Sequence, residues 1–209
     1  MYVDIHTHHA AKANGIAIQS LSISEISISS DSKGYFSVGC HPWFSDQWSA
    51  SVRKQIEQWL LDKRVVAIGE CGLDKNCLVP FEKQLSIFEK QIELSEKKQK
   101  PMIIHCVGCF NEFFELKRRI KPSQLWILHG FRGKPQLAQQ ALQLGFGLSF
   151  GVRFNPESVK ITPLEKLFIE TDESELEIGE VYAAVAAAKG CRPEELMAGR
   201  LLLEQQQLK

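Results

Sequence analysis

The sequence predicts an α/β fold, a compact (β/α)8 barrel in which the first βα unit is abbreviated. Eight apolar runs of strand length are spread over 209 residues, and amphipathic helical stretches separate most of them. A typical barrel needs about 250 residues. This chain is shorter, and we expect the missing residues to be in its first third, where no convincing helix separates His8 from Tyr35. An open, doubly wound sheet is the alternative, but the chain lacks the GxGxxG and GxxxxGK(S/T) phosphate motifs. We expect one domain over residues 1–209.

The expected elements follow from apolar runs and from the proline residues that open helices. A helix over residues 80–98 starts at a proline and carries Phe81, Leu85, Phe88 and Ile92 on one face. The expected strands are 2–6, 16–21, 35–40, 65–69, 102–106, 125–128, 146–150 and 167–169. The other expected helices are 47–61, 110–119, 135–144, 178–189 and a last one that opens at Pro193.

Composition excludes some classes of protein. Lys+Arg and Asp+Glu number 25 each, so the net charge is zero, which argues against a broadly basic protein that coats nucleic acid. No stretch approaches 18 uncharged apolar residues, and the first residues show neither a basic nor an apolar leader region. We therefore expect a cytoplasmic protein with no membrane partner, and a monomer, with an oligomer left open.

The six cysteines are expected to be reduced and structural. A disulfide framework is improbable in a chain of this length without a secretory leader. Cys106 and Cys109 form a CxxC pair, which can be a redox pair or half of a zinc site, but no second pair completes a zinc site. Strand alternation would point Cys71 and Cys106 away from their neighbours Glu70 and His105, toward the helical layer.

All six histidines lie at or just after the end of a predicted strand. None of the six lies in a predicted helix, and each ends or follows an apolar strand; they are His6, His8, His9, His41, His105 and His129. Glu70, Glu170 and Asp172 are placed in the same way. In a parallel barrel the carboxyl ends of all strands open onto one face, where active sites are built. We expect these side chains to converge there.

Imidazole and carboxylate groups together predict a divalent-metal site. They suit Zn²⁺, Mn²⁺, Fe²⁺ or Co²⁺, and several carboxylates without cysteine also admit Mg²⁺. His6 and His8 are two residues apart, so on a strand both point to the same face. The predicted ligands are His6, His8, Glu70, His105, His129 and Asp172. We interpret His9 as a bystander and Glu170 as a supporting residue, and His41 remains open between a structural and a functional role.

Six motifs occur in order: DIHTH at 4–8, GCHPW at 39–43, AIGECGLD at 67–74, PMIIH at 101–105, HGFRG at 129–133 and IETD at 169–172. This combination resembles the TatD family of metal-dependent hydrolases, over residues 3 to 200. The resemblance implies a (β/α)8 barrel, one to three divalent metal ions and phosphodiester hydrolysis, typically as a deoxyribonuclease.

The resemblance also implies residue roles. His6 and His8 would bind one metal ion, Glu70 would bridge two, and His105 and His129 would hold the second. Asp172 would bind the first ion and its water, and His41 matches a position near the substrate phosphate. Asp172 and Glu70 are thus the predicted catalytic residues. Arg132 and Arg153, on the loops after the sixth and seventh strands, are the predicted phosphate contacts.

The chain departs from the family around the substrate rather than around the metal. His9-Ala10 stands where the family has Leu-Asp, Cys106-Val107-Gly108 follows His105 in place of a cationic contact, and residues 173–177 are acidic and short. A DNA or small phosphodiester substrate is expected, with a small amide or ester as the alternative. A non-catalytic protein that keeps the metal site for structure is the third hypothesis, and the presence of all six expected ligands argues against it.

Overall fold

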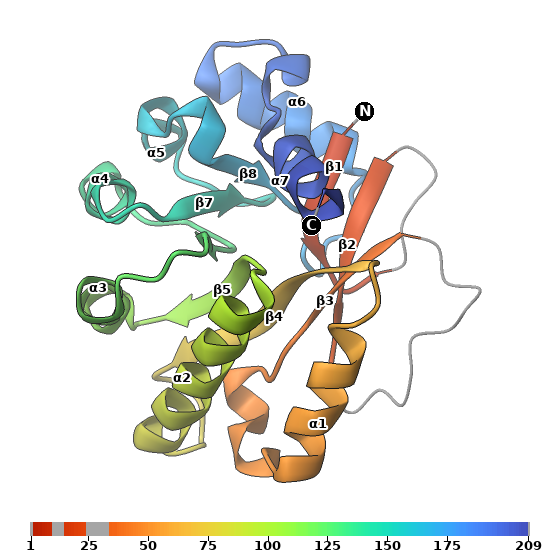
Figure 1. Ribbon diagram of the computed structural model, residues 1–209. Coiled ribbons are helices and arrows are strands. Elements are labelled where there is room, and N and C mark those ends of the chain that lie inside the picture. Colours follow the sequence, from red (N-terminus) through yellow and green to blue (C-terminus); the bar gives the residue numbers. More distant parts are fainter. Residues whose placement is uncertain (1, 10–14, 24–33, 209) are drawn as a thin grey trace. The chain divides into compact units, whose positions relative to one another are not determined.

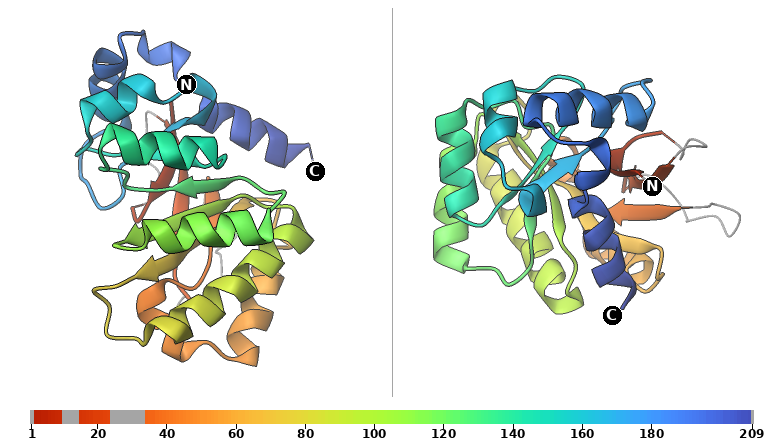
Figure 2. Two further views of the ribbon diagram at one scale, coloured as in Figure 1. Left: turned by 90° about the vertical axis from the view of Figure 1, so that its left-hand side faces the viewer. Right: turned by 90° about the horizontal axis from the view of Figure 1, so that it is seen from above.

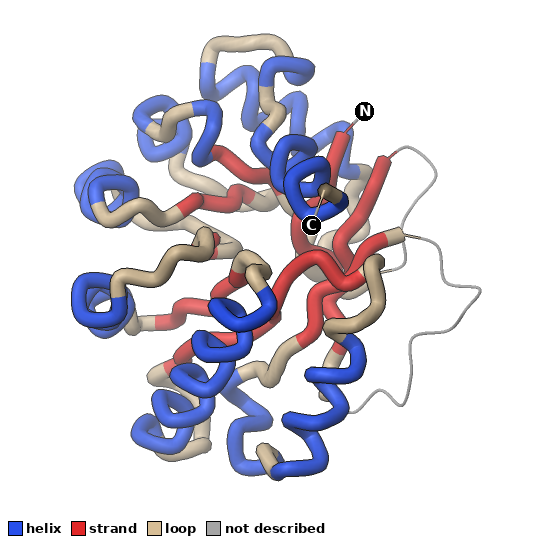
Figure 3. The backbone as a smooth tube through the Cα atoms, in the orientation of Figure 1, coloured by secondary structure: helices blue, strands red, loops and turns tan. Residues whose placement is uncertain are grey.

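The computed structural model describes residues 2–9, 15–23 and 34–208. Eight strands form one sheet in chain order, from β1 to β8, and helices follow the later strands (Figure 1; Figure 3). The strands are β1 Tyr2–Thr7, β2 Gly15–Leu21, β3 Tyr35–Val38, β4 Val65–Asp74, β5 Met102–Val107, β6 Trp126–Leu128, β7 Gly147–Phe150 and β8 Leu167–Ile169. The register pairs β1 with β2, β3 with β4, β4 with β5, β6 with β7 and β7 with β8, all in parallel. All eight expected strands are present.

The helices are also close to expectation. They are η1 Pro42–Gln47, α1 Ala50–Trp59, α2 Phe81–Lys98, α3 Phe110–Ile120, α4 Pro135–Gln143, α5 Pro156–Ile161, η2 Leu164–Lys166, α6 Ile178–Lys189, η3 Pro193–Glu195 and α7 Ala198–Gln207. Among the described residues no helix precedes η1, in agreement with an abbreviated first βα unit. A parallel bridge joins Thr7 to Asp172 beyond β8, so the first and last strands of the sheet meet. This is the topology of a (β/α)8 barrel.

The chain divides into two compact units, residues 1–19 with 127–209 and residues 20–126. In the first unit, α7 packs against β1 (Figure 2). Gly199 permits the close approach, because a Cβ there would lie 3.0 Å from Ile5 Cγ2. The apolar core of this unit includes Ile5, Leu148, Phe150 and Phe168, each at most 2% exposed.

In the second unit, Phe88 of α2 lies between two other buried rings. Its centroid is 5.2 Å from that of Phe113 on α3 and 5.6 Å from that of Trp126 at the start of β6, and both pairs are T-shaped. Strand β4 continues to Asp74, five residues beyond the expected end. Gly72 makes this possible, because a Cβ there would lie 2.0 Å from the carbonyl oxygen of His105 on β5. Both Glu70 and Asp74 therefore stand on one continuous strand.

No helix in the described part of the chain is long and apolar enough to cross a bilayer.

Candidate metal centre

Three of the predicted ligands meet at the carboxyl end of β1. His6 and His8 come from β1 and the residue after it, and Asp172 follows β8. The Nε2 atoms of both histidines lie 3.6 Å from the same oxygen, Asp172 Oδ1. His6 is fully buried, whereas the side chains of His8 and Asp172 are 39% and 33% exposed. The group is thus open to solvent on one side, as a site that binds a substrate must be.

Backbone hydrogen bonds fix Asp172 against β1. Its N–H donates to the carbonyl oxygen of His6 at 3.0 Å, and its own carbonyl accepts from the N–H of His8 at 3.1 Å. Its φ of 56° lies in the left-handed region, which Asp and Asn enter more readily than most residues. The carboxylate is therefore held in place by the strand that carries the two histidines.

Asp4 links Thr171, the residue before Asp172, to strand β1. Its carboxylate accepts from the N–H of Thr171 at 3.1 Å, from the hydroxyl of Thr171 at 2.5 Å and from the N–H of His6 at 3.3 Å. Burial raises the pKa of Asp4 to about 6, although the hydrogen bonds from Thr171 act in the opposite direction. Asp4 thus ties the chain after β8 to β1.

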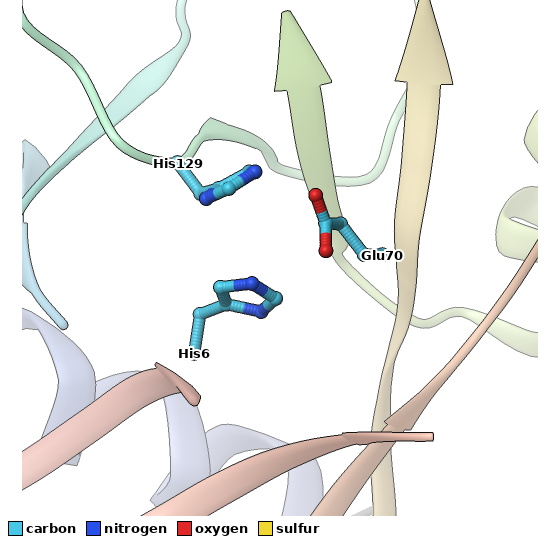
Figure 4. A group of neighbouring side chains, drawn as sticks. All are labelled: His6, Glu70 and His129. Atoms are coloured by element: carbon cyan, nitrogen blue, oxygen red, sulfur yellow. The ribbon is translucent and has the colours of Figure 1, made fainter. Parts of the chain in front are cut away.

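His129 and Glu170 extend the group within the same unit. The ring of His129, just after β6, lies 4.4 Å from that of His6 between centroids (Figure 4). Its Nδ1 is 3.4 Å from Oε1 of Glu170, which also accepts from the N–H of Gly130 at 2.6 Å. Glu170 is fully buried, and its Oε2 has no hydrogen-bond partner among the described residues. One donor atom from each of His129, Glu170 and Asp172 falls within 4.8 Å of the others, so Glu170 joins the potential ligands.

A second group lies in the other unit. Glu70 on β4, which Figure 4 also labels, is 7% exposed, and its Oε1 is 2.8 Å from Nδ1 of His105 on β5. The same oxygen is 3.3 Å from Nε2 of His41, which follows β3. His41 and His105 are each 15% exposed, and their rings lie 4.4 Å apart. Two imidazoles therefore converge on one buried carboxylate.

Hydrogen bonding distinguishes His41 from a simple metal ligand. Its Nδ1 accepts from the backbone N–H of Trp43 at 3.3 Å. The neutral ring then carries its proton on Nε2, the atom that faces Glu70. A protonated Nε2 donates a hydrogen bond to an oxygen, and without that proton His41 belongs with Glu70 and His105 to a group whose donor atoms lie within 4.8 Å of one another and could hold a metal ion. The tautomer with the proton on Nε2 fits a contact to a phosphate oxygen, which is the role expected for His41.

His105 lies between two carboxylates, since its Nε2 is 3.4 Å from Oδ2 of Asp74. Burial alone would raise the pKa of Asp74, but hydrogen bonds from the Trp43 indole, the Asn76 backbone and His105 outweigh it and leave the pKa below its ordinary value. Asp74 is therefore ionised at neutral pH and orients the ring, with Nδ1 directed toward Glu70. A carboxylate behind a metal-binding histidine is a recurrent arrangement.

Two glutamines of α2 hold the strand ends that carry this group. Gln91 accepts from the N–H of Cys40 at 2.7 Å and donates to its carbonyl at 3.0 Å, beside His41. Gln84 makes the same pair of bonds to Asp74, at 2.8 and 3.1 Å. Both side chains are 1% exposed. The buried face of α2 thus includes two polar residues, whereas the expected Phe81 and Leu85 are only half-buried.

The two predicted phosphate contacts line one groove in the first unit. The groove has a volume of about 350 Å³ and includes Arg132 and Arg153 on one part of its wall and Glu170 and Asp172 on another. Both arginines are exposed. His9, by contrast, is held outside this groove by its N–H bond to Thr7 and by Nε2, which lies 3.2 Å from the carbonyl oxygen of Glu173.

All six cysteines are free thiols. Burial raises the pKa of the thiols of Cys71 and Cys106 well above their ordinary value and raises that of Cys109 to about 11. The thiol of Cys71 donates to the backbone carbonyl of Ile103 rather than to a site residue. Thiols that stay protonated neither bind metal nor act as nucleophiles at neutral pH.

The donor set fits a divalent cation. It consists of imidazole nitrogens and carboxylate oxygens, the ligands of Zn²⁺, Mn²⁺, Fe²⁺ and Co²⁺, and the carboxylates also suit Mg²⁺. Glu170 Oε2, a fully buried carboxylate oxygen, has no hydrogen-bond partner among the described residues, and an unsatisfied buried polar atom is costly. A cation beside Asp172 and Glu170 would remove that cost.

Comparisons with known proteins agree with this chemistry. A family model described as TatD related DNase matches residues 4–198. The 3'-5' ssDNA/RNA exonuclease TatD of Rahnella sp. is 34% identical over 149 residues, which are 64% of this chain and 55% of that protein. The 3'-5' RNA nuclease TATDN2 of Homo sapiens is 30% identical over 146 residues, 64% of this chain and 19% of that protein. The chain thus matches about half the length of the bacterial relative.

A third relative links the sequence to a solved structure. The uncharacterized metal-dependent hydrolase YjjV of Escherichia coli is 31% identical over 153 residues, 68% of this chain and 59% of that protein. The crystal structure of YjjV superposes with a TM-score of 0.79 at 20% identity and covers 99% of this chain and 97% of that one. A TatD family hydrolase from Entamoeba histolytica gives 0.75 at 16% identity, with 97% of each chain covered. These likenesses show the shared barrel fold.

Proposed function

Because the chain belongs to the TatD-related DNase family, we propose that it is a divalent-metal-dependent phosphodiesterase that cleaves nucleic acid, a deoxyribonuclease of TatD type. The observation that carries the proposal is the convergence of His6 Nε2 and His8 Nε2 on one oxygen of Asp172, each at 3.6 Å. Imidazole and carboxylate donors gathered in this way on strand ends are the expected basis of metal-assisted hydrolysis.

The proposed ligands are the six predicted from the sequence. His6, His8 and Asp172 would hold one ion, and Glu70, His105 and His129 would provide the donors for a second, with Glu70 as the bridging ligand that the resemblance implies. We add Glu170, since its Oε1 lies 3.4 Å from His129 Nδ1 and its Oε2 has no hydrogen-bond partner among the described residues. One to three ions of Zn, Mg, Mn, Fe or Co are consistent with such donors.

A bound divalent ion supplies Lewis acidity, and it lowers the pKa of water so that hydroxide forms near neutral pH. Side chains of the protein would perform the other steps. Asp172 orients the attacking water and accepts its proton, and its fixed backbone keeps the carboxylate oriented. His41 donates from Nε2 to a phosphate oxygen. Arg132 and Arg153 bind further phosphates from the wall of their groove.

Single-stranded nucleic acid is the proposed substrate, by analogy with the nucleases named among the relatives. One observation favours a second candidate. The groove that holds Arg132 and Arg153 is also lined by Glu173, in an acidic segment that repels a polyanion. Hydrolysis of a small amide or ester by the same residues is therefore the alternative.

We propose that residues 1–209 act as one catalytic domain and that the protein works as a monomer in the cytoplasm.

Metal analysis and a substrate screen test the proposed function. Purified protein is assayed for bound metals and then for turnover of bis(p-nitrophenyl) phosphate, single-stranded DNA, RNA and simple amides, with Asp172→Asn as the control. We expect metal-dependent phosphodiester cleavage that the variant lacks. If all phosphodiesters are inert and an amide turns over, the alternative holds. If nothing turns over in metal-loaded protein, the hydrolase proposal is wrong.

A further inference from the structure

A large aromatic side chain stands exposed beside the second ligand group. Trp43 is 55% exposed, although an indole ring usually finds a buried position. Its ring lies 4.8 Å from that of His41 and 6.3 Å from that of His105, at near-perpendicular angles to both. The ring therefore adjoins the group that is proposed to bind the substrate phosphate.

The ring is held rather than mobile. Its Nε1 donates to Oδ2 of Asp74 at 2.8 Å, and its backbone N–H donates to Nδ1 of His41. Trp43 also belongs to the short helix η1, which begins at the buried Pro42. A residue fixed at its backbone and at the end of its ring loses little conformational freedom when a ligand binds.

The charged groups near the Trp43 indole indicate which kind of ligand it can bind. Asp74 and Glu70 are carboxylates, so an anionic group would be repelled from the indole unless a cation intervened. A nucleobase is planar, apolar on its face and uncharged, and stacking on aromatic side chains is how proteins bind bases of single strands without sequence preference.

We propose that Trp43 is the stacking platform for a base of a single-stranded nucleic acid, next to the nucleotide whose phosphate is cleaved. This inference rests on the proposed function and names the residue that would bind a base of its substrate. Base stacking on one aromatic side chain contributes about 1–3 kcal/mol, so removal of the ring should weaken binding about tenfold. A double-stranded substrate, whose bases are already stacked, should not gain from the platform.

Binding in Ca²⁺, to strands with nuclease-resistant phosphorothioate linkages, keeps a cation at the carboxylates and tests the platform without turnover. Fluorescence anisotropy compares a labelled oligo(dT) eight-mer with an abasic strand of the same length and charge. Trp43→Ala should weaken binding of oligo(dT) about tenfold and leave the abasic strand unchanged. Trp43→Phe keeps an aromatic face but loses the bond to Asp74, and should retain most of the affinity. Leu78→Ala, at a fully exposed apolar position, should bind both strands as the wild type does.

The outcomes separate this inference from the proposed function. If Trp43→Ala binds oligo(dT) like the wild type, or weakens both strands equally, the platform is wrong. It is also wrong if Trp43→Phe is as weak as Trp43→Ala, because the bond to Asp74 would then be what matters. If wild-type protein hydrolyses phosphodiesters but binds oligo(dT) no better than the abasic strand, the proposed function stands and the role of Trp43 is wrong. If binding of oligo(dT) depends on the ring but no phosphodiester is hydrolysed, the role of Trp43 stands and the proposed function is wrong.

Discussion

Asp172 and His6 are joined both through the backbone and through their side chains. The N–H of Asp172 donates to the carbonyl oxygen of His6 at 3.0 Å, and its Oδ1 lies 3.6 Å from His6 Nε2. The residue proposed as the base is thus positioned by the segment that carries two of the proposed metal ligands, His6 and His8. Its place does not depend on the acidic loop that follows it.

The first prediction concerns Asp172→Asn. The backbone bonds and the left-handed φ of 56° are both compatible with asparagine, so the variant should fold. The amide cannot accept a proton from water, and loss of a general base costs about 10²–10⁴-fold in rate. The measurement is phosphodiester turnover with added metal, with circular dichroism to establish folding. His9→Ala, at a residue whose Nε2 contacts the backbone carbonyl of Glu173 rather than a proposed metal ligand, should remain close to wild type. A folded Asp172→Asn with near-normal turnover would remove Asp172 as the base.

The second prediction concerns metal and stability. A ligand at 100 times its Kd stabilises the folded state by about 2.7 kcal/mol, which for a chain of this size raises Tm by about 5–10 °C. Melting in Mn²⁺ should therefore exceed melting in EDTA by that amount. His8→Ala should lose most of this rise and His9→Ala should keep it. An equal response of both variants would show that the ion binds elsewhere.

The strands were predictable because each is a short, mainly apolar run, and the polar residues that follow several of them also located the histidines. Helix α5 was not predicted, since its six residues are too few to show a helical period. The expected end of β4 at residue 69 was too early. Polar residues at Glu70 and Asp74 interrupt the apolar pattern, and both are buried because other residues of the site pair with them.

The site was predictable in its residue types but not in its internal bonds. Histidines and carboxylates on strand ends are visible in the sequence, whereas the bond from Trp43 N–H to His41 Nδ1 depends on the local turn. The burial of Gln84 and Gln91 could not be predicted from residue type, because glutamine on a helix normally indicates an exposed face. Their spacing of seven residues, which places both on one helical face, is the only hint.

The third prediction concerns Gln91→Leu. This change leaves the buried N–H and carbonyl of Cys40 without partners. Each such group costs about 1–3 kcal/mol, so the free energy of unfolding should fall by about 2–6 kcal/mol in urea denaturation. Turnover should also fall, because His41 is the next residue. Gln140→Leu, at an exposed position of α4, should change stability by no more than about 0.5 kcal/mol. Equal stability of the two variants would contradict the proposed role of Gln91.

The last prediction concerns the pH dependence of stability through Glu96. Its carboxylate accepts from the N–H and hydroxyl of Ser123 at 3.2 and 2.5 Å and from the N–H of Gln124 at 3.0 Å. Burial acts to raise its pKa, but these bonds outweigh burial, so the pKa in the folded state lies below the ordinary value. Stabilisation is therefore complete above the unfolded pKa of about 4.3 and is lost as the pH falls through the folded pKa. Glu96→Gln should cost about 1 kcal/mol at pH 7, a modest value for a partly exposed group, and less at pH 3. Urea denaturation of both proteins at the two pH values measures this difference, and a gap that widens toward pH 3 would reverse the sign argued for Glu96.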